Sequence, residues 1–187
     1  MTETGGSMSA QADSTQDSQG GQGSQTGEVS IVFVCTGNIC RSAMAERIAA
    51  AELSDLPLHI DSAGISDEEH GNPIDPRAAR VLSERGYDTA GHAARQLTAD
   101  WLASRDIAIV MTERHRQATE RLLESVPEAN RPEVRMLRSY DPACAGRTGD
   151  DLDVFDPWYG DQDGFYETFD MITAALPGIR EAVASRR

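Results

Sequence analysis

The sequence predicts a three-layer α/β/α fold, in which helices cover both faces of a four-stranded parallel sheet. Short apolar runs alternate along the chain with longer segments that have the spacing of helices, and this alternation is typical of parallel sheets. A short Gly-containing loop joins the first apolar run to the first helical segment. Sites in such folds lie beyond the carboxyl ends of the strands, so this loop is the first place to look for one.

Four apolar runs are the candidate strands, and the crossovers between them should be right-handed. The run that begins at Val29 is almost continuously apolar, which favours a strand buried on both faces of the sheet. The predicted strands are residues 29–34, 58–61, 107–111 and 134–137.

Four segments have helical patterns, and three of them begin with a residue that can cap a helix. The side-chain oxygens of Ser42, Asp75 and Thr112 can accept hydrogen bonds from free amides of a first helical turn. Pro76 suits that first turn, and Gly86 is a signal for a helix end. The predicted helices are residues 42–53, 75–86, 112–123 and 165–184.

The N-terminal segment differs in composition from the remainder of the chain. Residues 1–28 are rich in Gly, Ser and Gln and hold no large aliphatic or aromatic residue other than Met. Such a segment cannot bury enough apolar surface to fold, so we expect a disordered tail or leader, with one domain over residues 29–187. It lacks the pattern of a secretory signal, and no stretch is apolar enough to span a membrane.

The charge and the cysteine count limit the classes of function. The formal net charge is −14, and all 17 basic residues are Arg, which argues against binding to nucleic acid or to an anionic membrane. Three cysteines do not suggest a disulfide framework, and a reducing compartment suits a working thiol. We therefore expect a cytoplasmic protein, with export without a signal peptide as the alternative. We also expect neither a metal nor a cofactor.

The loop from Cys35 to Ser42 carries the main chemical signal. A strand that feeds a Gly-containing loop and then a helix points backbone amides at one spot, where an anion binds. Cys35 opens the loop, where its thiolate would be stabilised as an anion. Arg41 closes it and can hold two phosphate oxygens in its planar fork. The loop thus predicts a nucleophile beside a phosphate cradle; the alternative is an inert buried cysteine.

A second signal lies near the C-terminus, at Asp156. A thiolate that attacks a phosphate ester forms a cysteinyl-phosphate, and the leaving oxygen then needs a proton from a nearby acid. Asp156 precedes Pro157 and two aromatic residues, Trp158 and Tyr159. An acid beside aromatic walls suits an aromatic phosphoester; the alternative is an ordinary Asp-Pro turn.

Together, these two motifs resemble the low-molecular-weight protein tyrosine phosphatases of the bacterial type. The likeness covers residues 29–185, essentially everything but the tail. Other matching stretches are residues 61–64, 75–78, 92–96 and 138–142.

The resemblance implies a hydrolase that acts on phosphotyrosine-containing proteins and holds inorganic phosphate or another oxyanion in its loop. Cys35 would be the nucleophile, Arg41 the phosphate clamp, and Asp156 first the acid and then the base. Asn38 would hold the loop, Ser42 would steady the thiolate, and His92 would support the same polar network. The remaining implied binding residues are Thr36, Gly37, Ile39, Cys40, Trp158 and Tyr159.

Some features depart from the family pattern. Ala43 stands where the family usually has Pro, and residues 66–70 lack the aromatic that often forms one wall of the cleft. We expect that side of the cleft to be more open and more acidic. The resemblance also implies a reversible disulfide between Cys35 and Cys40. The alternative is that Cys40 is a packing residue. Cys144 is expected in an exposed loop without a role.

Three rival functions share this scaffold. A thioredoxin-coupled arsenate reductase would need relay cysteines near residues 110–125, and that stretch has none. A protein-arginine phosphatase carries Thr where this chain has Ile39, and an apolar side chain suits an aromatic ring better than a guanidinium. A phosphate-binding module without catalysis would have no need to retain Cys35, Arg41 and Asp156 together.

Overall fold

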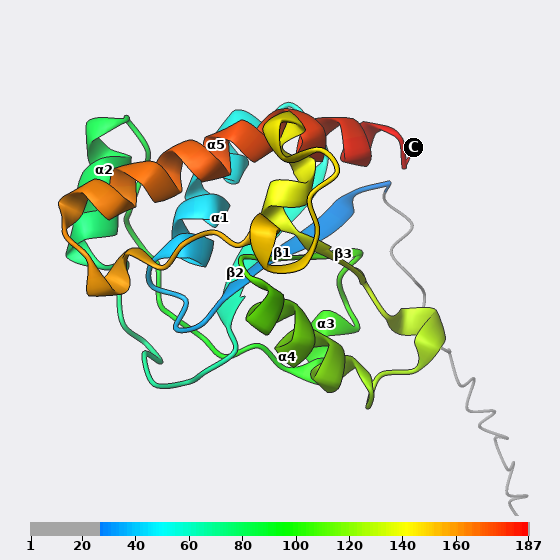
Figure 1. Cartoon of the computed structure of the whole chain (residues 1–187). Coiled ribbons are helices and arrows are strands. Elements are labelled where there is room, and N and C mark those ends of the chain that lie inside the picture. Colours follow the sequence, from blue (N-terminus) through cyan, green and yellow to red (C-terminus); the bar gives the residue numbers. More distant parts are fainter. Residues whose placement is uncertain (1–26, 187) are drawn as a thin grey trace, which may run out of the picture.

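Four parallel strands form a single sheet in the order β2–β1–β3–β4 (Figure 1). The computed structural model describes residues 27–186, so most of the predicted tail, residues 1–28, lies outside the described residues. The strands are β1 (Val29–Cys35), β2 (Leu58–Gly64), β3 (Ile107–Val110) and β4 (Glu133–Met136). The predicted parallel sheet is confirmed.

Strand β1 lies at the centre of the sheet and is buried on both faces. It pairs in parallel with β2 over its whole length and with β3 on its other edge. Ile31 and Phe33 point into the apolar core on one face, whereas Val32 and Val34 point into the core on the other. The apolar run that starts at Val29 therefore reflects a strand without a solvent face.

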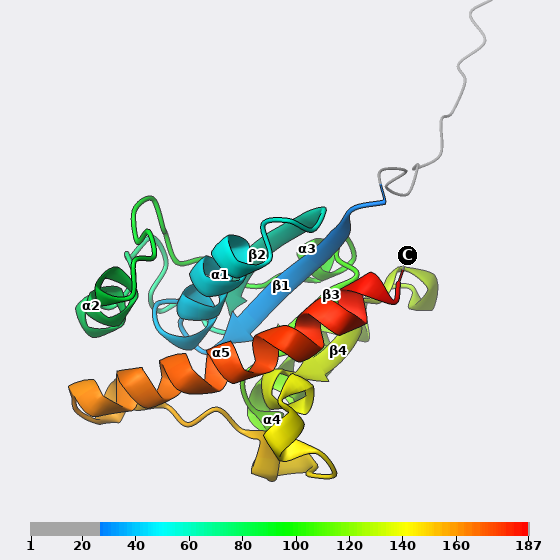
Figure 2. The ribbon, with the colours of Figure 1, turned by 90° about the horizontal axis from the view of Figure 1, so that it is seen from above.

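Helices cover both faces of this sheet, so the molecule has the three layers that the sequence predicts (Figure 1). The helices α1 (Arg41–Glu52), α2 (Pro76–Glu84) and α5 (Gln162–Ala184) share one core with Ile31 and Phe33. Figure 2 shows that α1 and α5 both lie over the near face of the sheet. On the other face, α3 (Ala99–Leu102) and α4 (Glu113–Leu123) share a core with Val32 and Val34.

Two of the three expected helix caps are present. The Asp75 carboxylate accepts a hydrogen bond from the Arg77 amide, and the Thr112 hydroxyl accepts one from the His115 amide. The prediction for Ser42 is wrong: α1 begins at Arg41, and its N-cap, Cys40, makes no side-chain cap. The Ser42 hydroxyl instead turns toward the Cys35 thiol, because the preceding loop folds inward.

The stretch between β4 and α5 holds four short 3₁₀ turns. They are Leu137–Tyr140, Pro142–Cys144, Gly149–Leu152 and Pro157–Tyr159. The expectation that Cys144 is exposed is wrong, because its turn places the side chain in the core beneath α4, with Leu152 and Met136. Helix α3, capped by Thr98, was not expected from the sequence. Among the described residues, no helix has the length and apolar character needed to cross a membrane.

Candidate active site

A cavity of about 310 Å³ lies at the carboxyl end of β1. The phosphate loop (residues 35–42) forms its floor, and the segment 156–160, hereafter the acid loop, forms one side. The structure thus brings the two sequence motifs together, although more than 100 residues separate Arg41 from Asp156. The lining residues are Cys35, Thr36, Gly37, Ile39, Cys40, Arg41, Glu68, Glu69, Asp156, Trp158 and Tyr159.

Asn38 does not line the cavity but lies behind the loop, fully buried. Its backbone has a φ of 61°, in the left-handed region that Asn tolerates better than most residues. Its side-chain oxygen accepts a hydrogen bond from the Arg95 amide at 3.1 Å, and its Nδ2 donates to Ser42 Oγ at 3.0 Å and to Ser62 Oγ at 2.8 Å. One buried amide therefore ties the loop to β2 and to the segment between α2 and α3.

Ser42 is placed to stabilise a thiolate. Its Oγ lies 3.0 Å from Cys35 Sγ, and the same oxygen accepts the hydrogen bond from Asn38. The hydroxyl keeps its hydrogen and a second lone pair, so either the thiol or the hydroxyl can donate across this contact, whereas toward a thiolate only the hydroxyl can donate.

His92 contacts the phosphate loop from outside the cavity lining. Its Nε2 donates to the backbone oxygen of Asn38 at 2.6 Å. Burial lowers the pKa of His92, an effect that the Asn38 carbonyl opposes. A neutral ring with its proton on Nε2 satisfies this contact.

Arg41 connects the phosphate loop to the acid loop. Its Nη2 lies 2.6 Å from Asp156 Oδ2, and its Nη1 donates to the Val154 carbonyl at 3.2 Å. The Nε of Arg41 is buried and has no hydrogen-bond partner among the described residues, so a donor remains for an oxyanion. Asp156 is partly exposed, and its other oxygen accepts from the Trp158 amide at 3.1 Å.

The two upper walls of the cavity differ in chemistry. Trp158 and Tyr159 stand on one wall, with 42% and 90% of their surfaces exposed. Glu68 and Glu69 stand on the other, as the absence of an aromatic in residues 66–70 suggests. The Glu69 side chain lies so close to Gly37 that an added Cβ there would meet it at 2.9 Å.

Further residues beside the loop were not singled out from the sequence. His115 is almost fully buried, with its Nε2 2.9 Å from Thr36 Oγ1 and its Nδ1 2.9 Å from Thr112 Oγ1. Burial, aided by the charges of Arg41 and Arg114, lowers its pKa to about 3. The only available signal was its position in the first turn after β3, at the same sheet edge as Cys35.

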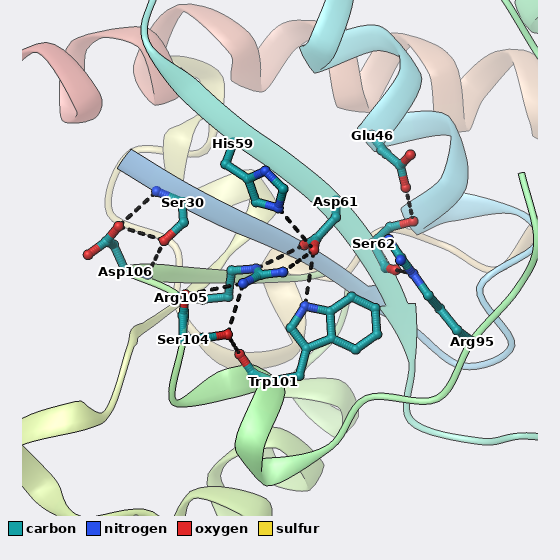
Figure 3. A network of polar contacts seen from close by, with 10 residues as sticks. All are labelled: Ser30, Glu46, His59, Asp61, Ser62, Arg95, Trp101, Ser104, Arg105 and Asp106. Carbon is teal, nitrogen blue, oxygen red and sulfur yellow. Dashed lines mark hydrogen bonds and ion pairs between the residues drawn. The ribbon is translucent and has the colours of Figure 1, made fainter. Parts of the chain in front are cut away.

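Ser62 is a second such residue, at the end of β2. Figure 3 shows its hydroxyl donating to Glu46 and its carbonyl accepting from Arg95. On the outer side of β2, Asp61 binds Arg105, the Trp101 indole and His59. Ser62 lies in a stretch that matches the family pattern, but the sequence did not indicate which residues it would contact.

The three cysteines are buried and form no disulfide. Burial and the charge of Asp75 raise the pKa of Cys40, so this thiol is protonated at neutral pH. Its pairing with Cys35 stays a prediction.

Comparisons with known proteins agree on one family. The model of the family described as low molecular weight phosphotyrosine protein phosphatase matches residues 30–187. A low molecular weight protein-tyrosine-phosphatase of Streptomyces coelicolor is 45% identical over 157 residues, which cover 82% of this chain and 92% of that protein. The low molecular weight protein-tyrosine phosphatase A of Mycobacterium tuberculosis is 43% identical over 161 residues, which cover 83% of this chain and 92% of that protein. The crystal structure of Erwinia amylovora tyrosine phosphatase amsI superimposes with a TM-score of 0.69 at 29% identity, covering 82% of this chain and 91% of that one.

Proposed function

Because the chain belongs to the low-molecular-weight phosphotyrosine protein phosphatase family, it is a protein-tyrosine phosphatase, and we propose that Cys35, Arg41 and Asp156 are its catalytic residues. The observation that carries this assignment is their convergence on one cavity, with a serine hydroxyl 3.0 Å from the cysteine sulfur. We further propose that the catalytic domain comprises residues 29–187.

In the first step, the amides of the phosphate loop and Arg41 hold the non-bridging oxygens of the phosphate. The Cys35 thiolate attacks phosphorus, so that an S–P bond forms while the bond to the tyrosine oxygen breaks. Asp156, at the rim of the cavity, donates its proton to the leaving oxygen. The Ser42 hydroxyl is placed to stabilise the sulfur anion before attack and after its release.

In the second step, the Asp156 carboxylate removes a proton from a water molecule. The water oxygen attacks phosphorus, the S–P bond breaks, and the Cys35 thiolate is restored as inorganic phosphate leaves. Arg41 serves both steps because the charge on the phosphoryl oxygens is similar in each.

The shape of the cavity supports phosphotyrosine in proteins as the substrate. Trp158 and Tyr159 offer aromatic surface to the ring, and Ile39 supplies an apolar floor that suits a ring better than a guanidinium. An arsenate reductase would need a relay of cysteines, and Cys144 is buried away from the cavity lining. We propose cytoplasmic phosphotyrosine proteins as partners, with no role for nucleic acid or membranes.

The assignment is tested with peptides that carry phosphotyrosine or phosphoarginine, and with arsenate plus thioredoxin. We expect turnover of the phosphotyrosine peptide and of p-nitrophenyl phosphate. After rapid acid quenching, phosphate should be found on Cys35 by mass spectrometry. Turnover without phosphate on Cys35, or a preference for phosphoarginine, would contradict the proposal.

A further inference from the structure

Arg77 lies outside the cavity lining yet contacts both loops that form the site, directly or through one residue. It is in the first turn of α2, directly after the cap residue Asp75 and Pro76. Helix α2 and the start of α5 lie at the same end of the molecule (Figure 1). About one third of the Arg77 side chain is exposed, so its contacts and not its burial suggest a role.

One side of the Arg77 guanidinium binds Asp75. Its Nε and Nη2 donate to the two carboxylate oxygens of Asp75, each at 3.1 Å. This is the two-pronged geometry that Arg forms with carboxylates and that Lys cannot reproduce. Asp75 in turn is joined to the phosphate loop, because its amide donates to the Ile39 carbonyl at 2.8 Å.

The other side of the guanidinium binds the acid loop. Its Nη1 donates to the backbone oxygens of Trp158 and Gly160, both at 3.2 Å. Its central carbon lies 4.6 Å from the centre of the Phe165 ring and 5.4 Å from that of the Trp158 ring, within the range of a cation–π contact.

Asp156 itself has few contacts of its own. Its carboxylate binds Arg41 and the Trp158 amide, and the residues after it form only a short 3₁₀ turn, with no strand ladder to hold them. Arg41 and Trp158 together therefore set where the Asp156 carboxylate lies, one at each of its oxygens. Arg77 is the side chain that links Trp158 and Gly160 to Asp75 and, through it, to the phosphate loop.

We propose that Arg77 is a positioning residue for proton donation: it holds the acid loop at a set distance from the phosphate loop, so that Asp156 reaches the leaving oxygen. This inference rests on the proposed role of Asp156 as the acid. Arg77 should affect the efficiency of proton transfer from Asp156. It should have no effect on the binding of phosphate, which is the task of the phosphate loop.

The test compares Arg77→Lys and Arg77→Gln with Arg80→Gln. Arg80 is a matched control on the same helix, in an exposed pair with Glu84. The maximal rate is measured on aryl phosphates whose leaving groups range from good to poor. We expect both Arg77 variants to lose about 10-fold or more on phenyl phosphate, part of the usual contribution of a general acid. They should lose much less on 2,4-dinitrophenyl phosphate, whose leaving group needs no proton.

Two further measurements separate positioning from general damage. Competitive inhibition by inorganic phosphate should be unchanged, because Arg41 and the loop amides are intact. In the double variant Arg77→Gln/Asp156→Asn, the loss on phenyl phosphate should equal that of Asp156→Asn alone, because there is no longer an acid to position. If Arg77→Gln fails to fold, Asp75→Asn tests the same link, since Asn retains the ability to cap α2.

A loss that is equal for all leaving groups, or one that adds fully to that of Asp156→Asn, would overturn the role of Arg77. The result for Asp156→Asn alone keeps the two proposals distinct. If that variant shows no dependence on the leaving group, the assignment of the acid fails. If it does and the Arg77 variants do not, only the inference about Arg77 fails.

Discussion

The two loops that meet at the cavity are held in place in different ways. The phosphate loop is internal: Asn38 and Ser42 are fully buried and pair with each other and with neighbours on β2. The acid loop is external, with Trp158 and Tyr159 exposed and with its position set by arginines from α1 and α2.

This difference matches the role that we propose for each loop. The nucleophile and its anion cradle must keep one geometry, which a buried and satisfied hydrogen-bond network provides. The acid and the aromatic wall must admit and release a substrate, which requires exposure. We therefore expect loss of the buried Asn38 amide, which holds the phosphate loop, to affect both stability and rate, and changes in the acid loop to affect rate alone.

The largest effect is expected at the nucleophile. Cys35→Ser should abolish turnover, because a serine hydroxyl in this loop lacks the thiolate that forms the covalent intermediate. Binding of inorganic phosphate, measured by calorimetry, and thermal unfolding should stay close to the wild type. More than a trace of phosphatase activity would contradict the covalent mechanism.

The next largest effect is expected at the acid loop. Asp156→Asn should lower the maximal rate on phenyl phosphate by about 10²–10⁴-fold, the usual range for one general acid. Its melting temperature should change little, since the carboxylate is partly exposed. A large fall in stability would show that the acid loop belongs to the rigid part of the molecule. The two loops would then not differ in how they are held.

The phosphate-loop network should show the opposite balance. Asn38→Ala leaves the hydroxyl groups of Ser42 and Ser62 and the Arg95 amide short of a partner. We expect the free energy of unfolding in urea to fall by about 1–3 kcal/mol, the cost of buried polar groups without partners. The rate should fall by up to about 10²-fold, because the loop loses its geometry. The exposed Asn72→Ala is the control, and equal losses of stability in the two variants would refute the prediction.

A smaller effect concerns the pH dependence of stability. The pKa of His115 is about 3 in the folded chain and about 6.5 in an unfolded one. The unfolded chain therefore takes up a proton first, so the stability that His115 contributes is present above pH 6.5 and is lost as the pH falls from 6.5 toward 3. The pKa of His92 is shifted in the same direction.

This effect can be measured by urea unfolding between pH 7 and pH 5. Replacing His115 by Gln removes one such titration, so the slope of stability against pH should decrease by at most about 1.4 kcal/mol per pH unit. His59→Gln, which alters an exposed histidine, serves as the control. Parallel slopes for the wild type and His115→Gln would contradict the prediction.

The smallest effect is expected at the acidic wall. Glu68 and Glu69 should favour phosphotyrosine peptides with a neighbouring Arg over peptides with a neighbouring Glu. Glu68→Gln/Glu69→Gln should reduce that preference in kcat/KM by about 2–5-fold, the scale of an exposed ion pair. The effect should shrink with added salt. Glu124→Gln is the control on a distant surface, and an unchanged preference in the double variant would rule out this wall as a selector.

Much of the fold was predictable because its signals are local. The apolar run of β1, the caps at Asp75 and Thr112, and the alternation of strands and helices each depend on residues close together in the chain. The phosphate loop was predictable for the same reason: Cys35 and Arg41 stand at its two ends, so its turn and the helix after it bring both to one cavity.

The remainder of the site was decided by the tertiary structure. Asp156 was placed from the family pattern, but its contact with Arg41 joins two residues 115 positions apart in the chain. Ser62 joins the phosphate loop to β2, and His115 joins it to α4. Arg77 joins the acid loop to α2. The helix cap expected from Ser42 and the exposed position expected for Cys144 were wrong for the same reason. Which polar groups pair in a buried site depends on the order of strands in the sheet and on the helices that cover it, and neither is a property of neighbouring residues in the chain.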